Sequence, residues 1–122
     1  MSMRTFVEAR GIVLGFHYWP EAPEEVAFLR ARHRHRFHWR VKVEVLHDDR
    51  QVEFVLLKRD VDRVFKLFPT SELGFDFATR SCEQIARMIC ETLINDGYRI
   101  HDVGVSEDGE FEGTVYAGGS AP

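Results

Sequence analysis

The sequence predicts an α+β domain, in which two helices cover one face of an antiparallel sheet. Three observations predict this fold class. Apolar and polar residues alternate over segment 33–46, which is the period of a strand with one buried face. After Leu57 and again after Ser81, apolar residues recur at helical spacing. Strand-like segments precede and follow these two helices, so antiparallel hairpins are expected on either side of them.

The first strand is predicted over residues 5–19, TFVEARGIVLGFHYW, where Gly11 and Gly15 indicate a bulge or bend. Residues 20–32, PEAPEEVAFLRAR, contain two prolines and are predicted to form a loop or an irregular excursion. The chain then enters the alternating strand over 33–46. Its buried face is expected to carry His33, His35, Phe37, Trp39, Val41, Val43 and Val45.

The middle of the chain changes from strand to helix. HDDR at 47–50 predicts a turn, and QVEFVL at 51–56 predicts a third strand that returns from it. From Leu57 the apolar spacing becomes helical, and Pro69 is expected to end this first helix.

The second helix has predicted boundaries at both ends. Ser81 and Gln84 have the spacing of a capping box, and Gly97 is the expected C-terminal stop. Beyond that glycine, YRIHDVGVSE and FEGTVYA are predicted to close the chain as a hairpin around an Asp-Gly turn.

The chain has 122 residues, enough for one compact domain, expected over residues 1–117 with a disordered tail at 118–122. A net charge of -4 argues against nucleic acid or an anionic membrane as a partner. No apolar stretch reaches the roughly 18 residues of a membrane span. Cys82 and Cys90 would lie about 12 Å apart on one helix, too far for a disulfide. We therefore expect reduced thiols and a cytoplasmic protein.

Three histidines are positioned to share a metal ion. Alternation puts His33 and His35 on the same face of one strand, roughly 7 Å apart at their bases. If the first two strands pair antiparallel across the excursion, His17 lands beside them. Three neutral imidazoles with an open fourth position are the ligand set of a catalytic zinc rather than a structural one. Such an ion polarises a substrate oxygen as a Lewis acid.

Each of these features also has a simpler interpretation. A His-x-His pair in a strand can be a surface feature without any metal. The arginines of segment 33–46 and His38 alternate onto the opposite face of the strand, which we expect to be solvated. The alternative for that face is a basic surface that binds a phosphate group or an acidic partner.

From about Phe6 to Tyr116, the order and spacing of the motifs resemble the 6-pyruvoyltetrahydropterin synthase and 6-carboxytetrahydropterin synthase family. HRHRFHWRV stands where the family has H-G-H-N-Y-x-V, and VEFVLLK stands where it has V-x-D-F-x-x-L-K. SCEQIA stands where the family has P-T-x-E-x-x-A, and VGVSED where it has a strand ending in E-T.

The resemblance implies a tunnelling fold: a four-stranded antiparallel sheet with two helices on one face, assembling into a barrel. The usual assembly in the family is a homo-hexamer of two stacked trimers. The resemblance also implies that His17, His33 and His35 hold Zn²⁺.

The resemblance further implies that Glu107 anchors the aminopyrimidine edge of a pterin substrate. A carboxylate suits this role because it accepts two parallel N–H bonds from the ring. The alternative for Glu107 is a solvated turn carboxylate. Ser81, Cys82 and Glu83 are implied to lie near the same pocket, which the family forms between subunits.

The sequence departs from the family at its proton-transfer groups. The family eliminates triphosphate from dihydroneopterin triphosphate, in biopterin or queuosine biosynthesis, with a cysteine before H-x-H as base and an Asp-His pair after the first helix. Here those stretches read EEVAFLRAR and KLFPTSELGF, which contain neither group. Glu24 and Glu25 are the predicted replacement bases, and the alternative is that they are solvated loop carboxylates.

Three functions are compatible with these features. The first is a zinc-dependent lyase of this type, acting on dihydroneopterin triphosphate or a related pterin. The second is a non-catalytic relative that binds a pterin or purine. The third is a small α+β interaction domain whose basic strand face binds an acidic partner.

Overall fold

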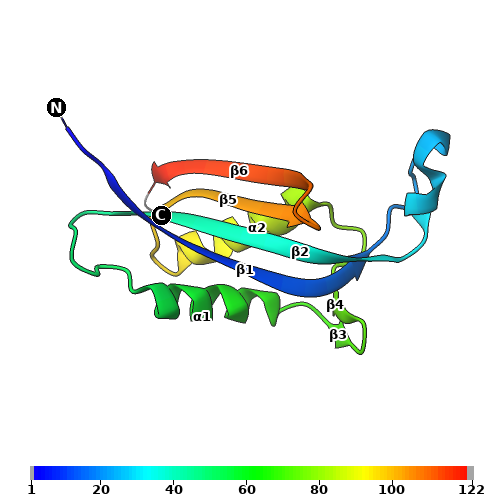
Figure 1. Ribbon diagram of the computed structural model, residues 1–122, viewed down its shortest axis with the longest axis horizontal. Coiled ribbons are helices and arrows are strands. Elements are labelled where there is room, and N and C mark those ends of the chain that lie inside the picture. The colour runs from blue at the N-terminus through cyan, green and yellow to red at the C-terminus, as the bar shows by residue number, and fades with distance from the viewer. Residues whose placement is uncertain (1, 121–122) are drawn as a thin grey trace.

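The structure is a computed structural model that describes residues 2–120. Four long strands form an antiparallel meander, and two helices cover one face of it (Figure 1). The α+β class is therefore confirmed, with a six-stranded mixed sheet of order β3-β4-β1-β2-β5-β6. The elements are β1 Thr5–His17, the 3-10 segment η1 Glu24–Arg30, β2 His33–Val45, α1 Phe54–Phe65, β3 Thr70–Ser71, β4 Gly74–Asp76, α2 Cys82–Asn95, β5 Ile100–Glu107 and β6 Phe111–Ser120.

The prediction of four antiparallel strands is wrong at the β1 edge of the sheet. The segment between the two helices, 69–80, for which no strand was predicted, forms the short β3–β4 hairpin, and β4 adds to β1 in parallel. Gly15 pairs with Phe75 and Phe16 with Asp76 in this addition. The hairpin gives partners to backbone groups at the end of β1 that an open edge would leave unpaired.

The predicted strand over 51–56 is also wrong, because α1 begins inside it. A carboxylate oxygen of Glu53 accepts a 2.8 Å hydrogen bond from the Leu56 N–H and so caps the first turn of α1. Phe54, Val55 and Leu56 are exposed at the start of this helix. The apolar residues of the predicted third strand thus lie on the exposed surface of a capped helix.

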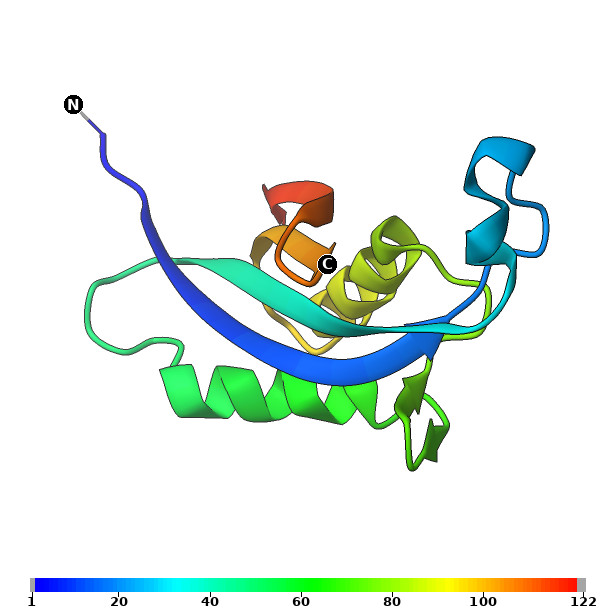
Figure 2. The same cartoon turned by 45° about the vertical axis from the view of Figure 1, so that its right-hand side comes forward.

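β1 and β2 pair in one continuous register from Thr5–Val45 to His17–His33. Of the bulge or bend predicted in β1, the bulge is therefore absent, while the strand is curved along its length (Figure 2). Gly11 and Gly15 serve close packing instead. A Cβ on Gly11 would lie 2.5 Å from the indole of Trp39, and one on Gly15 would lie 2.4 Å from the ring of Phe77. Both rings fill the space that a side chain on β1 would take.

The core lies between the sheet and the two helices, with α1 against β1 and α2 against β5 and β6. Figure 2 shows β1 and β2 as a long curved pair with α1 beneath them and η1 projecting at the far end. The face of β2 predicted to be buried carries the core residues Phe37, Trp39, Val41, Val43 and Val45.

The predicted boundaries of α2 and the last hairpin are confirmed. Ser81 and Gln84 form the capping box, and Gly97 follows the helix with φ +101°. Asp108 and Gly109 have φ values of 54° and 76°, as expected for a tight hairpin turn. β6 runs to Ser120, so its last residues overlap the segment predicted as a tail, of which residues 121–122 lie outside the described part.

Both cysteines are buried free thiols. Among residues 2–120, no helix has the length and apolar character needed to cross a membrane.

Candidate metal centre

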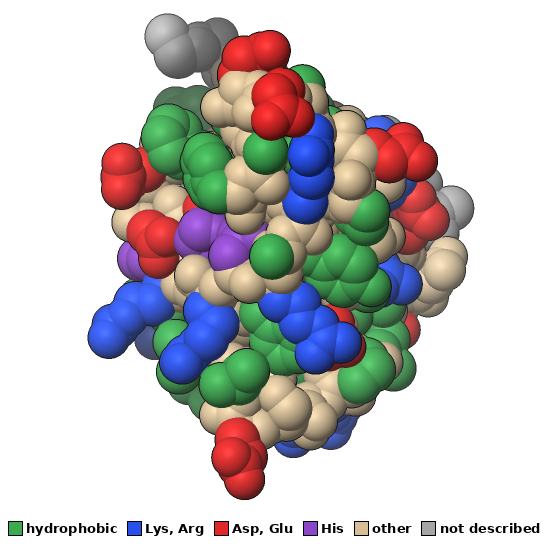
Figure 3. Space-filling view, turned by 90° about the vertical axis from the view of Figure 1, so that its right-hand side faces the viewer, with side chains coloured by type: hydrophobic (Ala, Val, Ile, Leu, Met, Phe, Trp, Pro, Cys, Tyr) green, Lys and Arg blue, Asp and Glu red, His purple; other side chains and the backbone are tan. Residues whose placement is uncertain are grey.

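Strand pairing brings the three predicted histidines together at one end of the sheet. His17 is the register partner of His33, and His35 lies opposite Gly15. The ring centroids are 4.5 Å apart for His17–His33, 5.5 Å for His17–His35 and 5.1 Å for His33–His35. Figure 3 shows histidine side chains gathered at this end of the molecule, with acidic side chains beside them. The convergence predicted from alternation and antiparallel pairing is therefore confirmed.

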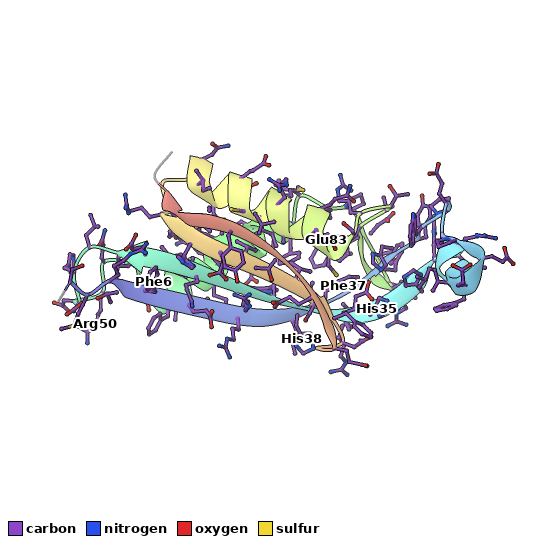
Figure 4. The ribbon with its side chains drawn as sticks, turned by 90° about the horizontal axis from the view of Figure 1, so that it is seen from above. Phe6, His35, Phe37, His38, Arg50 and Glu83 are labelled. Atoms are coloured by element: carbon purple, nitrogen blue, oxygen red, sulfur yellow. The ribbon has the colours of Figure 1, made fainter. Side chains whose placement is uncertain are left out.

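Phe37 is the apolar floor beneath two of the imidazoles. Its ring is fully buried and stands edge-on to His17 at 5.2 Å and to His35 at 5.6 Å. Figure 4 shows His35 and Phe37 at the same end of the sheet as Glu83, which lies at the start of α2. The histidine rings thus rest on the same core that joins the sheet to the helices.

One nitrogen of each imidazole is held by an oxygen atom outside the cluster. Nδ1 of His17 lies 2.8 Å from the Arg80 carbonyl oxygen, and Nδ1 of His33 lies 2.9 Å from the Ala31 carbonyl oxygen. Nδ1 of His35 lies 2.7 Å from a carboxylate oxygen of Asp108. Oxygens of these kinds accept hydrogen bonds, so in the neutral rings Nδ1 donates and Nε2 keeps its lone pair. Metal-binding histidines have this outer contact as a rule.

Glu107 completes the group from β5. It pairs with Phe37 across the sheet, so its side chain lies on the same face as His35. One carboxylate oxygen lies 3.0 Å from Nε2 of His17 and the other 3.5 Å from Nε2 of His35. Both Nε2 atoms are buried, and despite these short distances neither has a hydrogen bond of good geometry. The ligand atoms of the four residues lie within 4.8 Å of one another.

The electrostatics of the group favour a positive charge between the imidazoles and the carboxylate. Burial alone would lower the pKa of His17, but the contacts with Glu107 and with the Arg80 carbonyl outweigh it and raise that pKa above its ordinary value. The contact with His17 lowers the pKa of Glu107, against the effect of burial. Two buried nitrogens without partners, facing an anion, fit a divalent metal ion such as Zn²⁺.

A cleft of about 940 Å³ opens beside this group. All four residues implied to contact substrate line it, together with two of the histidines. The start of α2, the end of β5 and the first residues of β6 form part of its walls. The lining residues include His17, His33, Ser81, Cys82, Glu83 and Glu107.

No family model and no curated protein sequence matches this chain. Solved structures do. A 6-pyruvoyl tetrahydropterin synthase from Caenorhabditis elegans aligns over 94% of this chain and 96% of its own, with TM-score 0.67 and 14% identity. The chain has the fold of a 6-pyruvoyl tetrahydropterin synthase. The Plasmodium falciparum synthase aligns over 93% and 98%, with TM-score 0.63 and 18% identity. The uncharacterized protein WS1659 from Wolinella succinogenes aligns over 95% and 99%, with TM-score 0.70 and 14% identity.

Within this synthase fold, the two predicted replacement bases lie outside the cleft. Glu24 and Glu25 are exposed on η1, and Glu24 forms a 3.2 Å ion pair with Arg30. Leu29 is the residue of that segment that lines the cleft. The sequence could not show which side chains of η1 face the cleft, because so short a 3-10 segment has too few turns to give a periodic pattern.

Cys82 lines the cleft but is a buried thiol rather than a nucleophile. Burial, followed by the negative charges of Glu107, Glu83 and Glu112, raises its pKa to about 12. The thiol therefore stays protonated at neutral pH, and its sulfur lies 4.0 Å from a Glu107 oxygen to which it can donate.

Asp108 is a residue of the site that was not predicted from the sequence. One of its carboxylate oxygens contacts Nδ1 of His35, and the other accepts a 3.0 Å hydrogen bond from the Arg36 N–H. Asp108 therefore ties the β5–β6 turn to β2 and orients the His35 ring. The signal was an acidic residue directly after Glu107, which alone resembles an ordinary turn residue.

Asp108→Ala should weaken zinc binding about 10- to 100-fold, because His35 would lose the partner that keeps its Nε2 turned inward. Competition with a chromophoric chelator measures the dissociation constant. Asp62→Ala is the matched control, since Asp62 has only a 3.7 Å surface pair with Lys58 on α1. Equal zinc affinity in the two variants would contradict the role of Asp108.

Proposed function

We propose that this protein is a zinc-dependent enzyme of the 6-pyruvoyl- or 6-carboxytetrahydropterin synthase type, acting on dihydroneopterin triphosphate or a related pterin. The reaction is elimination of triphosphate with rearrangement or cleavage of the side chain. The observation that carries the proposal is a set of three inward-facing imidazoles beside a cleft, in a chain with this synthase fold.

His17, His33 and His35 would hold the zinc ion, which when bound polarises an oxygen of the substrate side chain. The other roles belong to side chains of the cleft. Glu107 can accept two N–H bonds from an aminopyrimidine edge, and its lowered pKa keeps it ionised for that purpose.

The wall of the cleft at the start of α2 orients the ring. Ser81 and Glu83, the neighbours of Cys82 in the sequence, have side-chain oxygens, and all three residues line the cleft with Glu107. The oxygen of Ser81 already accepts the Gln84 N–H within the capping box, so its position is fixed by the helix.

Proton transfer needs a base within hydrogen-bond reach of the substrate. Glu24 and Glu25 keep this proposed role only if η1 turns toward the cleft when substrate binds. Glu25→Gln combined with Glu24→Gln should then lower kcat by about 100-fold or more, while zinc content stays at the wild-type level. Steady-state assay of triphosphate release measures this, and an unchanged kcat would exclude both residues as the base.

Release of triphosphate from dihydroneopterin triphosphate by the zinc-loaded protein tests the proposal itself. We expect release that stops in protein stripped with a chelator and returns when zinc is added back. Pterin that binds without being consumed would favour the second candidate, a non-catalytic pterin-binding relative. The exposed positions of Glu24 and Glu25 are the observation that favours that candidate.

The third candidate, a basic strand face for an acidic partner, has less support. Arg40 lies at the centre of that face and makes ion pairs with Asp102, Glu112 and Glu8, the last at 3.9 Å. Its charge is therefore already neutralised within the chain.

Self-association into a barrel is part of the proposal. β6 is a ten-residue edge strand of the sheet, and Phe111 and Tyr116 on it are exposed by 71% and 72%. An edge strand of this length has a row of backbone N–H and C=O groups available to pair with a strand of another subunit, and the exposed aromatic rings could pack against that subunit. We expect light scattering at micromolar concentration to give an oligomer, with a hexamer as the family assembly; a monomer would contradict the barrel.

A further inference from the structure

We propose that the side chain of Arg80 binds the triphosphate of the substrate, so that the protein selects phosphorylated over unphosphorylated pterins. Arg80 lies in the connection between β4 and α2, directly before Ser81, the N-cap of that helix. This inference rests on the proposed function and narrows its substrate class to pterins that carry an anionic tail.

The charged side chains of the cleft are ordered by the strands that hold them. The sheet order β4-β1-β2-β5-β6 places the histidine cluster of β1 and β2 in the middle. The carboxylates of Glu107 on β5 and Glu112 on β6 line the cleft on one side of that cluster. Glu83 belongs to the same side, because its side chain packs on Gly113 of β6, where a Cβ would lie 2.8 Å from it.

The guanidinium of Arg80 lies on the opposite side of the histidine cluster, toward β4 and the end of α1. Its central carbon is 5.2 Å from the centroid of the Phe68 ring, and Nη1 is 3.5 Å from the Phe77 carbonyl oxygen. Phe68 follows α1 and Phe77 follows β4 directly. The backbone of Arg80 is fixed at the cluster itself, since its carbonyl oxygen lies 2.8 Å from Nδ1 of His17.

The charge of Arg80 has no partner within the described part of the chain. The side chain is exposed, and no carboxylate of residues 2–120 forms an ion pair with it, whereas Arg40 contacts three. Arg80 is also the only lysine or arginine among the described residues that line the cleft. A guanidinium has five N–H donors in a planar fork that matches phosphate oxygens, and the Phe77 carbonyl contacts only one of its nitrogens.

A pterin triphosphate has its groups in the matching order. The aminopyrimidine edge donates N–H bonds, the side chain next to the ring carries oxygen atoms, and the triphosphate at the far end is anionic. With the ring edge at Glu107 and a side-chain oxygen at the zinc ion, the tail extends toward Arg80. The three carboxylates on the other side repel a tail of the same charge, so they favour this orientation over the reverse one.

Neopterin and neopterin triphosphate differ only in the tail, and the fluorescence of the ring reports the binding of each to zinc-loaded protein. Wild type should bind the triphosphate at least about 10-fold more tightly than neopterin. Arg80→Gln should bind the triphosphate about 10- to 100-fold more weakly than wild type does, as for loss of a hydrogen bond to a charged group. Its zinc content and its affinity for neopterin should stay close to those of wild type. Arg80→Lys keeps the charge without the fork and should bind the triphosphate with intermediate affinity.

Arg87→Gln is the matched control, because Arg87 is exposed on α2 and is not among the described residues that line the cleft. It removes the same charge and should leave both affinities unchanged. The inference would be overturned by equal affinity of wild type for the two ligands, by a preference that survives in Arg80→Gln, or by equal losses in the two glutamine variants. In those cases neopterin still binds and the proposed function stands. Zinc-loaded wild type that binds neither ligand would instead contradict the proposed function.

Discussion

Replacing His35 by alanine should lower the zinc affinity of the protein by more than about 100-fold. Replacing a residue that only orients a metal ligand already lowers metal affinity about 10- to 100-fold. Replacing a ligand itself should lower the affinity further. Nε2 of His35, like Nε2 of His17, is buried without a well-formed hydrogen bond, and Asp108 holds the His35 ring so that this nitrogen faces the cluster. Dialysed protein should contain one zinc ion per chain in the wild type and close to none in the variant.

His38→Ala is the control for this experiment. His38 lies on the same strand but on the opposite face, in register with Ser106 rather than with the histidine cluster. Its replacement should leave the zinc content unchanged. A full complement of zinc in His35→Ala, or equal losses in the two variants, would show that the ion is held elsewhere.

Replacing Phe37 by alanine should lower the free energy of unfolding by about 3–5 kcal/mol. The ring has no exposed surface, lies 4.8 Å from the ring of Phe77, and supports two of the imidazoles. Alanine would leave a cavity between the sheet and the β4–α2 connection that the surrounding rings could fill only in part. Urea denaturation followed by circular dichroism measures the change.

Phe28→Ala provides the comparison, because Phe28 is 74% exposed on η1. Its effect should stay within about 0.5 kcal/mol, as for other surface positions. If the two variants lost equal stability, Phe37 would not be the core residue that the structure shows. Zinc binding by Phe37→Ala should also weaken, since His17 and His35 would lose the ring on which they rest.

The histidine cluster could be predicted because its causes are local. Alternation in a strand decides which residues share a face, and antiparallel pairing of neighbouring strands places His17 opposite His33. Glu107 was predicted as a site residue only from the family resemblance, because no local pattern in the sequence indicates that β5 pairs with β2.

Other features depended on tertiary contacts that no local pattern contains. β3 and β4 have two and three residues, too few for a period, and they form because the edge of β1 offers partners. The start of α1 was missed because Phe54 to Leu56 form an apolar run that is exposed in the folded chain. Asp108 is 73 positions from His35, and only the folded hairpin brings the two together.

X-ray absorption at the zinc edge decides whether the three histidines hold the ion, because it identifies the atoms bound to it. We expect three imidazole nitrogens and one further oxygen at about 2.0 Å from zinc, and no sulfur. His35→Ala should then retain no ordered zinc signal of this kind. A sulfur shell at about 2.3 Å would place the ion at Cys82 or Cys90, and fewer than three imidazoles in the wild type would contradict the metal centre described here.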